Sequence, residues 1–288
     1  MKTSVVGIKH LIVLADESPD FGVRLDTALT MAGKFDARLT CIYAQELNPR
    51  CVSQMFLNHV PYSIRSEIAE NMARFKESTA TEIQKVFETK VTAASWQSKS
   101  RWRRINGDPN HVASVVSRYA DLIICGQNGV ERFPEFHTVD PGEVVAVSGR
   151  PVFVVPRDYK PKGYSAHVLF AWNGSREAGR AISDAMMILD TDTRVTIATV
   201  GSAKDLPESF GFDMASRLNS WGIETRQVDI PTNGDRNRGM ALVRFARENG
   251  VDLIVMGAYS QSRLRQKVFG GVTQSVLKHM AAPVFLSH

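Results

Sequence analysis

The sequence predicts an α/β fold built from two tandem, open, five-stranded and mostly parallel sheets with helices on both faces. Three observations support this prediction. Short apolar runs of strand length alternate with amphipathic helical segments, which is typical of a parallel sheet with right-handed crossovers. The chain has 288 residues, enough for two domains of about 140 to 150 residues each. The second half also repeats the order of elements found in the first.

Residues 1–156, the first half, are interpreted as one domain with five strands. Its helical segments carry apolar residues at spacings of three and four, and its strands are short apolar runs bounded by turn residues. Strands are expected at 10–16, 38–43, 93–99, 121–126 and 151–156. Helices are expected at 23–35, at 64–87, after the N-cap and proline at 107–109, and at 142–148. We expect the long helix at 64–87 to pack its apolar face on the sheet.

Residues 167–288, the second half, repeat this order residue by residue. The run His-Val-Leu-Phe-Ala-Trp-Asn at 167–173 matches His-Leu-Ile-Val-Leu-Ala-Asp at 10–16, at an offset of 157 residues. Likewise Asp-Leu-Ile-Val-Met-Gly at 252–257 matches Asp-Leu-Ile-Ile-Cys-Gly at 121–126. Several matched elements in one order indicate an internal duplication. The segment 157–166, rich in Lys, Pro and Gly, is the predicted linker.

The composition indicates an ordinary globular protein. There are 35 basic and 30 acidic residues, a net charge of +5, and the three cysteines include no CxxC pair. Isolated cysteines of this kind suit reduced thiols. No run approaches the roughly 18 to 20 apolar residues of a membrane span, and no apolar signal core follows the N-terminus. We therefore expect a cytoplasmic protein with no membrane partner.

The densest basic cluster lies near the third strand, around Trp102. Its members are Lys99, Arg101, Arg103 and Arg104. Nucleic-acid binding is one interpretation, but a solvated strand end is the commoner explanation, so no nucleic-acid partner is expected. The seven histidines show no metal-ligand spacing with cysteines or carboxylates. His10 and His167 stand at equivalent strand starts, and we expect both to be structural.

A strand, a loop and a helix start follow one another at 251–271. The apolar run ends on Gly257, a polar and basic loop follows, and two glycines at 270–271 open the helix. Free N–H groups at a helix start suit phosphate, and glycines allow it to approach closely. In open α/β sheets, ligands bind beyond the carboxyl ends of the strands. The alternative is an ordinary strand-to-helix connection with a solvated basic loop.

Taken together, these features resemble the universal stress protein family. They are a first strand ending on an acidic residue, two βα units, and a Gly-x-x-Gly, nine residues, Gly-Ser/Thr signature before the last helix. The resemblance covers both halves, as in a tandem two-domain member, and implies a Rossmann-like sheet of the adenine nucleotide alpha hydrolase type. It also implies ATP or a related adenine nucleotide as ligand, accompanied by Mg²⁺, and a role as a stress-response sensor or regulator.

In the second half, the signature departs from the family pattern at two positions. Ser260 replaces the second Gly and Gly271 replaces the Ser/Thr, while the nine-residue spacer at 261–269 is kept. Backbone N–H groups can still bind phosphate, although losing the hydroxyl removes a hydrogen bond worth about 1 kcal/mol. Thr273 is a substitute if its hydroxyl points at the helix start, and otherwise a helix-face threonine. The nucleotide-binding residues that the resemblance implies are Asn173, Val200, Gly257, Ser260, Arg263, Gly270, Gly271, Val272 and Thr273.

Two of these residues lie, by the same resemblance, beside the adenosine. Asn173 stands where the family has an acidic residue, and unlike an ionised Asp it can both donate and accept hydrogen bonds. Val200 ends the second strand of this half, where the adenine contact falls. An apolar strand end explains Val200 equally well.

The first half keeps the acidic residue, Asp16, but not the phosphate loop. After Gly126 and Gly129, the spacer at 130–141 has twelve residues with two prolines, and Gly142 is followed by Glu143. A carboxylate at this point repels phosphate. We expect this degenerate site to bind nucleotide poorly or not at all, with Asp16 no more than a turn or cap residue.

The chain lacks the commonest catalytic motifs. It has no Walker A sequence and no Gly-x-Ser-x-Gly elbow, so we expect no enzyme, or at most slow ATP hydrolysis. The alternatives to a nucleotide-binding sensor are a scaffold acting through protein contacts, and an ATPase or adenylating enzyme.

The last strands of the two halves are the expected contact between them. The resemblance implies that they pair within one chain as a pseudo-dimer, and further assembly into a homodimer stays open. These segments are 151–155 and 283–286, each opening on a proline (Pro151, Pro283) and ending on an apolar residue (Val155, Leu286).

Overall fold

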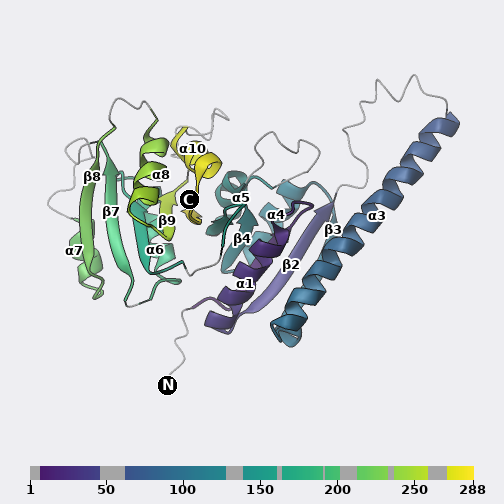
Figure 1. Ribbon diagram of the computed structural model, residues 1–288, viewed down its shortest axis with the longest axis horizontal. Helices are drawn as coiled ribbons and strands as arrows, with labels where there is room; N and C mark the ends of the chain where they lie inside the picture. The colour runs from purple at the N-terminus through teal and green to yellow at the C-terminus, as the bar shows by residue number, and fades with distance from the viewer. Residues whose placement is uncertain are drawn as a thin grey trace.

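The structure is a computed structural model that describes residues 7–45, 62–127, 139–160, 164–190, 192–201, 213–232, 237–258 and 271–288. Within these residues the chain alternates between strands and helices, as expected from the sequence (Figure 1). The α/β class is therefore confirmed.

All strands of the described residues belong to one ten-stranded sheet, in the order β3-β2-β1-β4-β5-β10-β9-β6-β7-β8. Each half contributes five parallel strands in the same order, mirrored about the centre of the sheet. The two predicted sheets are thus one continuous sheet. The strands are β1 (His10–Ala15), β2 (Arg38–Gln45), β3 (Ser100–Asn106), β4 (Leu122–Gly126), β5 (Val152–Val155), β6 (His167–Ala171), β7 (Arg194–Val200), β8 (Thr225–Ile230), β9 (Leu253–Gly257) and β10 (Val284–Ser287).

The helices cover both faces of this sheet. One buried cluster includes side chains of α1, α3, α6 and α7, and a second, on the other face, includes side chains of α4, α5, α8 and α10. The helices are α1 (Phe21–Phe35), α3 (Tyr62–Ala93), α4 (Pro109–Val116), α5 (Pro141–Ser148), α6 (Arg176–Ala185), α7 (Met214–Asn219), α8 (Arg238–Glu248) and α10 (Gly271–His279), with short 3₁₀ turns at Gln97–Lys99 and Ser117–Tyr119.

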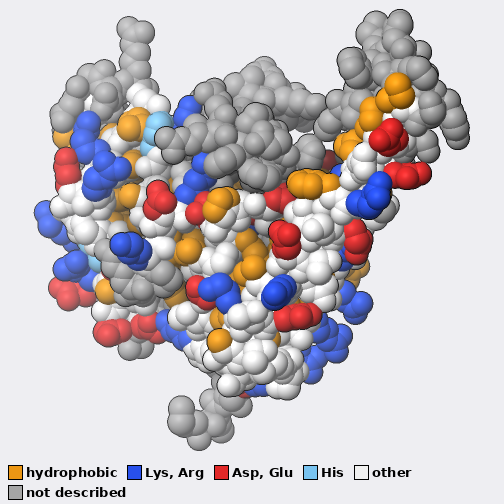
Figure 2. All heavy atoms as spheres, turned by 45° about the vertical axis from the view of Figure 1, so that its right-hand side comes forward, with side chains coloured by type: hydrophobic (Ala, Val, Ile, Leu, Met, Phe, Trp, Pro, Cys, Tyr) orange, Lys and Arg blue, Asp and Glu red, His pale blue; other side chains and the backbone are white. Residues whose placement is uncertain are grey.

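The long helix α3 packs on the sheet over only part of its length. Ile83, Phe87 and Val91 are buried, but towards the N-terminus of the helix Ile64 is 46% exposed and Phe75 is 73% exposed. Figure 1 shows this end projecting beyond the sheet, and in Figure 2 hydrophobic side chains lie along it. The prediction that the apolar face packs on the sheet therefore holds for the C-terminal part of the helix.

The third strand lies later in the chain than predicted. Residues 93–99 were expected to form it, but α3 continues to Ala93 and the strand β3 begins at Ser100. The helical spacing of Phe87 and Val91, both buried, extends the helix by another turn, and the chain reverses at Ser95 with φ of 56°. The alternation of apolar and polar residues over 93–99, on which the strand prediction rested, was a weaker signal than the helical spacing of the buried residues.

The two halves meet through their last strands, as expected from the sequence. Strand β10 pairs antiparallel with β5, and Phe285 stands opposite Phe153. Both side chains are fully buried. That this pairing makes the chain a pseudo-dimer, equivalent to a dimer of separate subunits, stays a prediction. The domain boundaries at 156 and 167 also stay predictions.

The duplication extends to the polar contacts at the strand starts. The Nε2 atom of His10 bonds the hydroxyl of Thr40 at 2.8 Å, and Nε2 of His167 bonds that of Thr196 at 2.9 Å. The Nδ1 atom of each ring bonds a backbone carbonyl oxygen that precedes the next strand, β4 or β9. The prediction that both histidines are structural agrees with these paired contacts.

Candidate functional site

The carboxyl edge of the second half brings together three of the predicted site residues. In the parallel register, Ala171 at the end of β6 lies beside Ala198 of β7 and Met256 of β9. Asn173, Val200 and Gly257 follow these residues within two positions, so they converge at one edge of the sheet. Ligands of open α/β sheets bind at such an edge.

The loop after β6 is shaped by its own polar side chains. The carboxamide oxygen of Asn173 accepts a hydrogen bond from the N–H of Ser175 at 3.1 Å. The Ser175 hydroxyl in turn accepts from the N–H of Ala178 at 3.1 Å and so caps α6. Asn173 is exposed, and its side chain belongs to a turn that positions the start of α6.

Gly257 allows a close approach between β9 and the first turn of α6. A Cβ atom at this position would lie 2.5 Å from the carbonyl carbon of Glu177 and 2.6 Å from the nitrogen of Ala178. The Glu177 side chain is buried and pairs with Arg176 at 3.1 Å. Packing alone therefore requires a glycine at position 257, whatever binds at this edge.

Helix α10 begins beside this edge, at Gly271. Gly271 is exposed, and no atom of the described residues lies within 4 Å of the position that a Cβ would take. Val272 is half-buried and Thr273 is buried in the helix. Ser260, Arg263 and Gly270 lie outside the described residues. The N-terminus of α10 provides a positive helix end.

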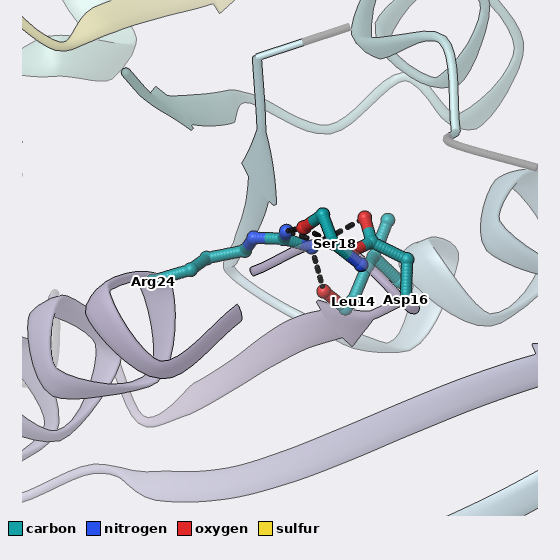
Figure 3. A network of polar contacts seen from close by, with 4 residues as sticks. All are labelled: Leu14, Asp16, Ser18 and Arg24. Carbon is teal, nitrogen blue, oxygen red and sulfur yellow. Dashed lines mark hydrogen bonds and ion pairs between the residues drawn. The ribbon is translucent and has the colours of Figure 1, made fainter. Parts of the chain in front are cut away.

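The first half has a buried ion pair at the equivalent edge, shown in Figure 3. The Arg24 guanidinium donates to both carboxylate oxygens of Asp16, at 2.8 and 2.9 Å, and to the carbonyl oxygen of Leu14 at 2.6 Å. Ser18 donates to Asp16 through its N–H and its hydroxyl. Burial by itself raises the pKa of Asp16, but the charge of Arg24 and these hydrogen bonds outweigh it and hold the pKa below its usual value. Asp16 is therefore more than a turn or cap residue, because it anchors this network.

Arg24 also covers the glycine at the end of β4. A Cβ on Gly126 would lie 2.7 Å from Nη2 of Arg24 and 2.9 Å from its Cζ. Within the part of the chain that the structure describes, the buried Nε of Arg24 has no hydrogen-bond partner. The guanidinium of Arg24 thus lies against the strand-end glycine of the first half, whereas in the second half the first turn of α6 lies against the equivalent glycine.

The helix start of the first half is capped by a carboxylate of the same chain. Asp140 precedes α5, and its Oδ1 accepts a hydrogen bond from the N–H of Gly142 at 2.8 Å. Glu143, which was expected to supply the repelling charge, is exposed. The carboxylate at this helix start is therefore that of Asp140, because an N-cap carboxylate reaches the first N–H groups directly. Gly129 lies outside the described residues.

Sequence reasoning missed Arg24 and Asp140. The internal repeat contained a signal for Arg24, because position 181, at the same offset of 157, is Ala. Asp140 directly precedes a proline and a glycine, which is the pattern of a helix N-cap followed by proline at the first helical position.

Several other features bear on the function. Among the described residues, no group of three or more His, Cys, Asp or Glu side chains could hold a metal ion. No helix in the described ranges is long and apolar enough to cross a membrane. Cys41 and Cys125 are buried free thiols, and burial raises the pKa of Cys125 to about 12. A thiol with so high a pKa is an unreactive core residue.

The fold and these two edges define a class of protein: a duplicated, parallel α/β protein whose two carboxyl edges have diverged. Residues 233–288 match the family model described as the universal stress protein family. This match shows the similarity to that family for the C-terminal segment of the chain.

Proteins of this family resemble the chain in sequence and in structure. Universal stress protein Slr1230 from Synechocystis is 27% identical over 168 residues, which are 57% of this chain and only 56% of that relative. The crystal structure of a universal stress protein from Archaeoglobus fulgidus covers 96% of this chain and 97% of its own, with a TM-score of 0.67 and 17% identity, and so shares the fold. Another universal stress protein, solved in complex with cAMP, covers 44% of this chain with a TM-score of 0.33 and 19% identity.

Proposed function

We propose that the chain is a nucleotide-binding sensor or regulator of the stress response, and that its second half binds ATP or a related adenine nucleotide. The ligand lies at the carboxyl edge formed by Asn173, Val200 and Gly257, with its phosphates at the start of α10. Mg²⁺ accompanies the phosphates, and the protein acts in the cytoplasm.

The contrast between the two carboxyl edges carries this proposal. In the first half, Asp16 is buried against Arg24, and Asp140 caps α5. In the second half the equivalent of Asp16 is the exposed Asn173, and position 181 is Ala. The first half thus pairs its buried carboxylate internally, whereas the second half presents an exposed polar side chain at the equivalent edge.

The helix start of α10 supplies the attraction for phosphate. Backbone N–H groups and the helix dipole stabilise an anion at such a position. Gly271 is exposed, and among the described residues nothing lies within 4 Å of its missing Cβ. The role proposed is binding rather than turnover.

Substitution of Gly271 tests this proposal. In Gly271→Asp the added carboxylate repels phosphate, and the dissociation constant for ATP is expected to rise at least about tenfold, equivalent to about 1.4 kcal/mol. Calorimetric titration with Mg-ATP measures the effect. The space at Gly271 means that the variant should fold like the parent protein.

Two controls separate charge from other effects. Gly271→Asn has nearly the same volume without the charge and should keep binding within about threefold. Gly33→Asp places the same charge at an open position on α1 and should change nothing. Absence of binding at millimolar ATP in the parent protein, together with no adenine nucleotide in denatured preparations, contradicts the proposal. A scaffold acting through protein contacts is then the remaining candidate.

A further inference from the structure

The amino edge of the first half carries a row of basic side chains. Lys9 precedes β1, Arg38 begins β2, and Arg101 is the second residue of β3. Arg118 precedes β4 and Arg150 precedes β5 by a few residues. Each of the five strands thus begins near a cation. Because β5 and β10 pair antiparallel, this amino edge of the first half faces the same way as the carboxyl edge of the second half, where the nucleotide site is proposed.

Strand register places these cations side by side. His10 lies beside Arg38 in the β1–β2 register, and Thr40 of β2 lies beside Arg101. Neighbouring strands are about 4.8 Å apart, so five strands set the cations along a line of about 19 Å. That length suits a linear polyanion better than a single small anion.

Strand β3 divides the basic cluster noted in the sequence between two faces. Trp102 contacts Tyr43 and Phe87, and Arg104 pairs with Glu77, so these two side chains face α3. Arg101 and Arg103 point to the other face, since side chains alternate along a strand. Arg103 therefore extends the row along β3.

The six cations of this row face solvent, although the Arg150 guanidinium donates to the carbonyl oxygen of Arg118 at 3.2 Å. The hydrogen bond from Lys99 and, more weakly, the charge of nearby Lys9 lower the pKa of the Asp36 carboxyl. Lys9, Arg38, Arg101, Arg103, Arg118 and Arg150 are all exposed. Within the ranges the structure describes, none of the six forms a salt bridge, whereas nearby Lys99 pairs with Asp36. The carboxylate of Asp121 faces the same edge, but it accepts hydrogen bonds from the N–H groups of Lys9 and His10. The row is consequently a positive surface.

The second half supplies an internal comparison, because it has the same fold without most of this charge. Arg194 and Arg226 occupy the register positions of Arg38 and Arg101. At the other positions of the row the cations are replaced by uncharged residues. Ala166 stands for Lys9, Val228 for Arg103, Asn249 for Arg118, and Ala282 for Arg150. The fold therefore does not require the row.

An aromatic side chain lies within the row. Tyr119 is 77% exposed, and its carbonyl oxygen bonds Nδ1 of His10. Its sequence equivalent in the second half is Gly250. An exposed ring among cations is the arrangement on which unpaired bases stack while the phosphates meet the charges.

We propose that this basic edge binds single-stranded nucleic acid, with phosphates along the six cations and a base stacked on Tyr119. The composition of the whole chain gave no reason to expect this partner. The row becomes visible only when strand register brings together residues that are distant in sequence.

Binding of a fluorescently labelled single-stranded RNA of about 12 nucleotides tests the proposal. Fluorescence anisotropy should show saturable binding by the full-length protein at low salt. If four phosphates are contacted, the affinity should fall about 50-fold between about 50 and about 200 mM salt. Arg38→Glu/Arg101→Glu should weaken binding at least about tenfold, and Tyr119→Ala at least about fivefold.

The second half provides the matched control. Arg194→Glu/Arg226→Glu changes the equivalent positions and the same net charge, and should leave the affinity within about twofold. All the substituted side chains are exposed, so thermal unfolding should stay unchanged in every variant.

Other outcomes would overturn the proposal. They are no saturable binding at low salt, equal losses in the two paired variants, or a duplex that binds as well as the single strand and is insensitive to Tyr119→Ala. Sedimentation with phosphatidylglycerol vesicles, without binding to the oligonucleotide, would assign the edge to a membrane surface instead.

Discussion

The two halves of this protein have the same strand order, but different groups pack at the carboxyl ends of their strands. In the first half a long side chain, Arg24, crosses the space beneath Gly126 and pairs with Asp16. In the second half, where position 181 is Ala, the first turn of α6 lies directly against Gly257. The two equivalent strand-end glycines, Gly126 and Gly257, therefore make room for different groups: a side chain in the first half and helix backbone in the second.

This difference changes how the glycine should be interpreted. A glycine after an apolar strand matches the start of a phosphate-loop signature, and both halves have one. In both halves, however, the missing Cβ makes room for another part of the same chain. The glycine is thus a requirement of the sheet edge. The described difference between the two edges lies in the buried Arg24–Asp16 pair and the Asp140 cap of the first half, and in the exposed Asn173 of the second.

The largest effect is expected from removing the ion pair that closes the first half. Arg24→Ala leaves the Asp16 carboxylate buried without its partner, since the two side chains are only 3% and 8% exposed. Loss of one member of a buried pair costs about 3 to 5 kcal/mol. Urea unfolding measures this cost. Arg180→Ala, which breaks an exposed pair with Asp184 on α6, should cost less than about 1 kcal/mol. Similar losses in the two variants would contradict a special role for Arg24.

A smaller loss of stability is expected from substituting the strand-end glycines, and it should differ between Gly257 and Gly126. Gly257→Ala forces the backbone of Glu177 and Ala178 to move, which should destabilise the protein by about 1 to 3 kcal/mol. Gly126→Ala meets the end of a long side chain, which can shift, so its cost should be less than half as large. The free energies of unfolding of the two variants give the comparison directly. Equal costs would mean that Arg24 is held as rigidly as a backbone.

The equivalent histidine–threonine hydrogen bonds at the amino ends of the strands should contribute similarly to the stability of the two halves. Thr40→Val and Thr196→Val each remove a hydroxyl that bonds a histidine ring. Each should cost about 1 kcal/mol in unfolding free energy, with the larger loss at Thr196 because its pair is more deeply buried. A Thr40→Val variant less stable than Thr196→Val would show that the duplicated contacts are not equivalent.

The smallest effect is a difference in acid response between the halves. Burial, together with the charge of Arg194, lowers the pKa of His167 in the folded protein. The unfolded chain then binds a proton more readily, so stability falls as the pH drops below about 6.5. Asp16 behaves in the same direction but in a lower window, because its folded pKa lies below the unfolded value of about 3.9.

Urea unfolding between pH 8 and pH 3 distinguishes these two contributions. His167→Asn should flatten the decline that begins near pH 6.5 and leave the decline below about pH 4. Asp16→Asn should act only on the lower decline. A change in the wrong window would assign the acid sensitivity to other groups.

Much of the fold could be predicted because its determinants are local. The apolar runs around Val13 and Ile254 mark buried strands, and the repeat at an offset of 157 marks the duplication. The third strand was misplaced at 93–99 because a weak alternation competed with a helix whose packing partner lies elsewhere in the chain. The convergence of Asn173, Val200 and Gly257 followed from the rule that parallel strands end at one edge.

The sequence alone determined the α/β class, the alternation of strands and helices along the chain, and the internal repeat, because apolar periodicity and turn residues act within a few positions. Tertiary structure decided which groups meet. Only the folded chain shows Arg24 paired with Asp16 and a row of cations on neighbouring strands. These contacts join residues on separate elements, and their energies depend on burial and distance, which spacing along the chain does not encode.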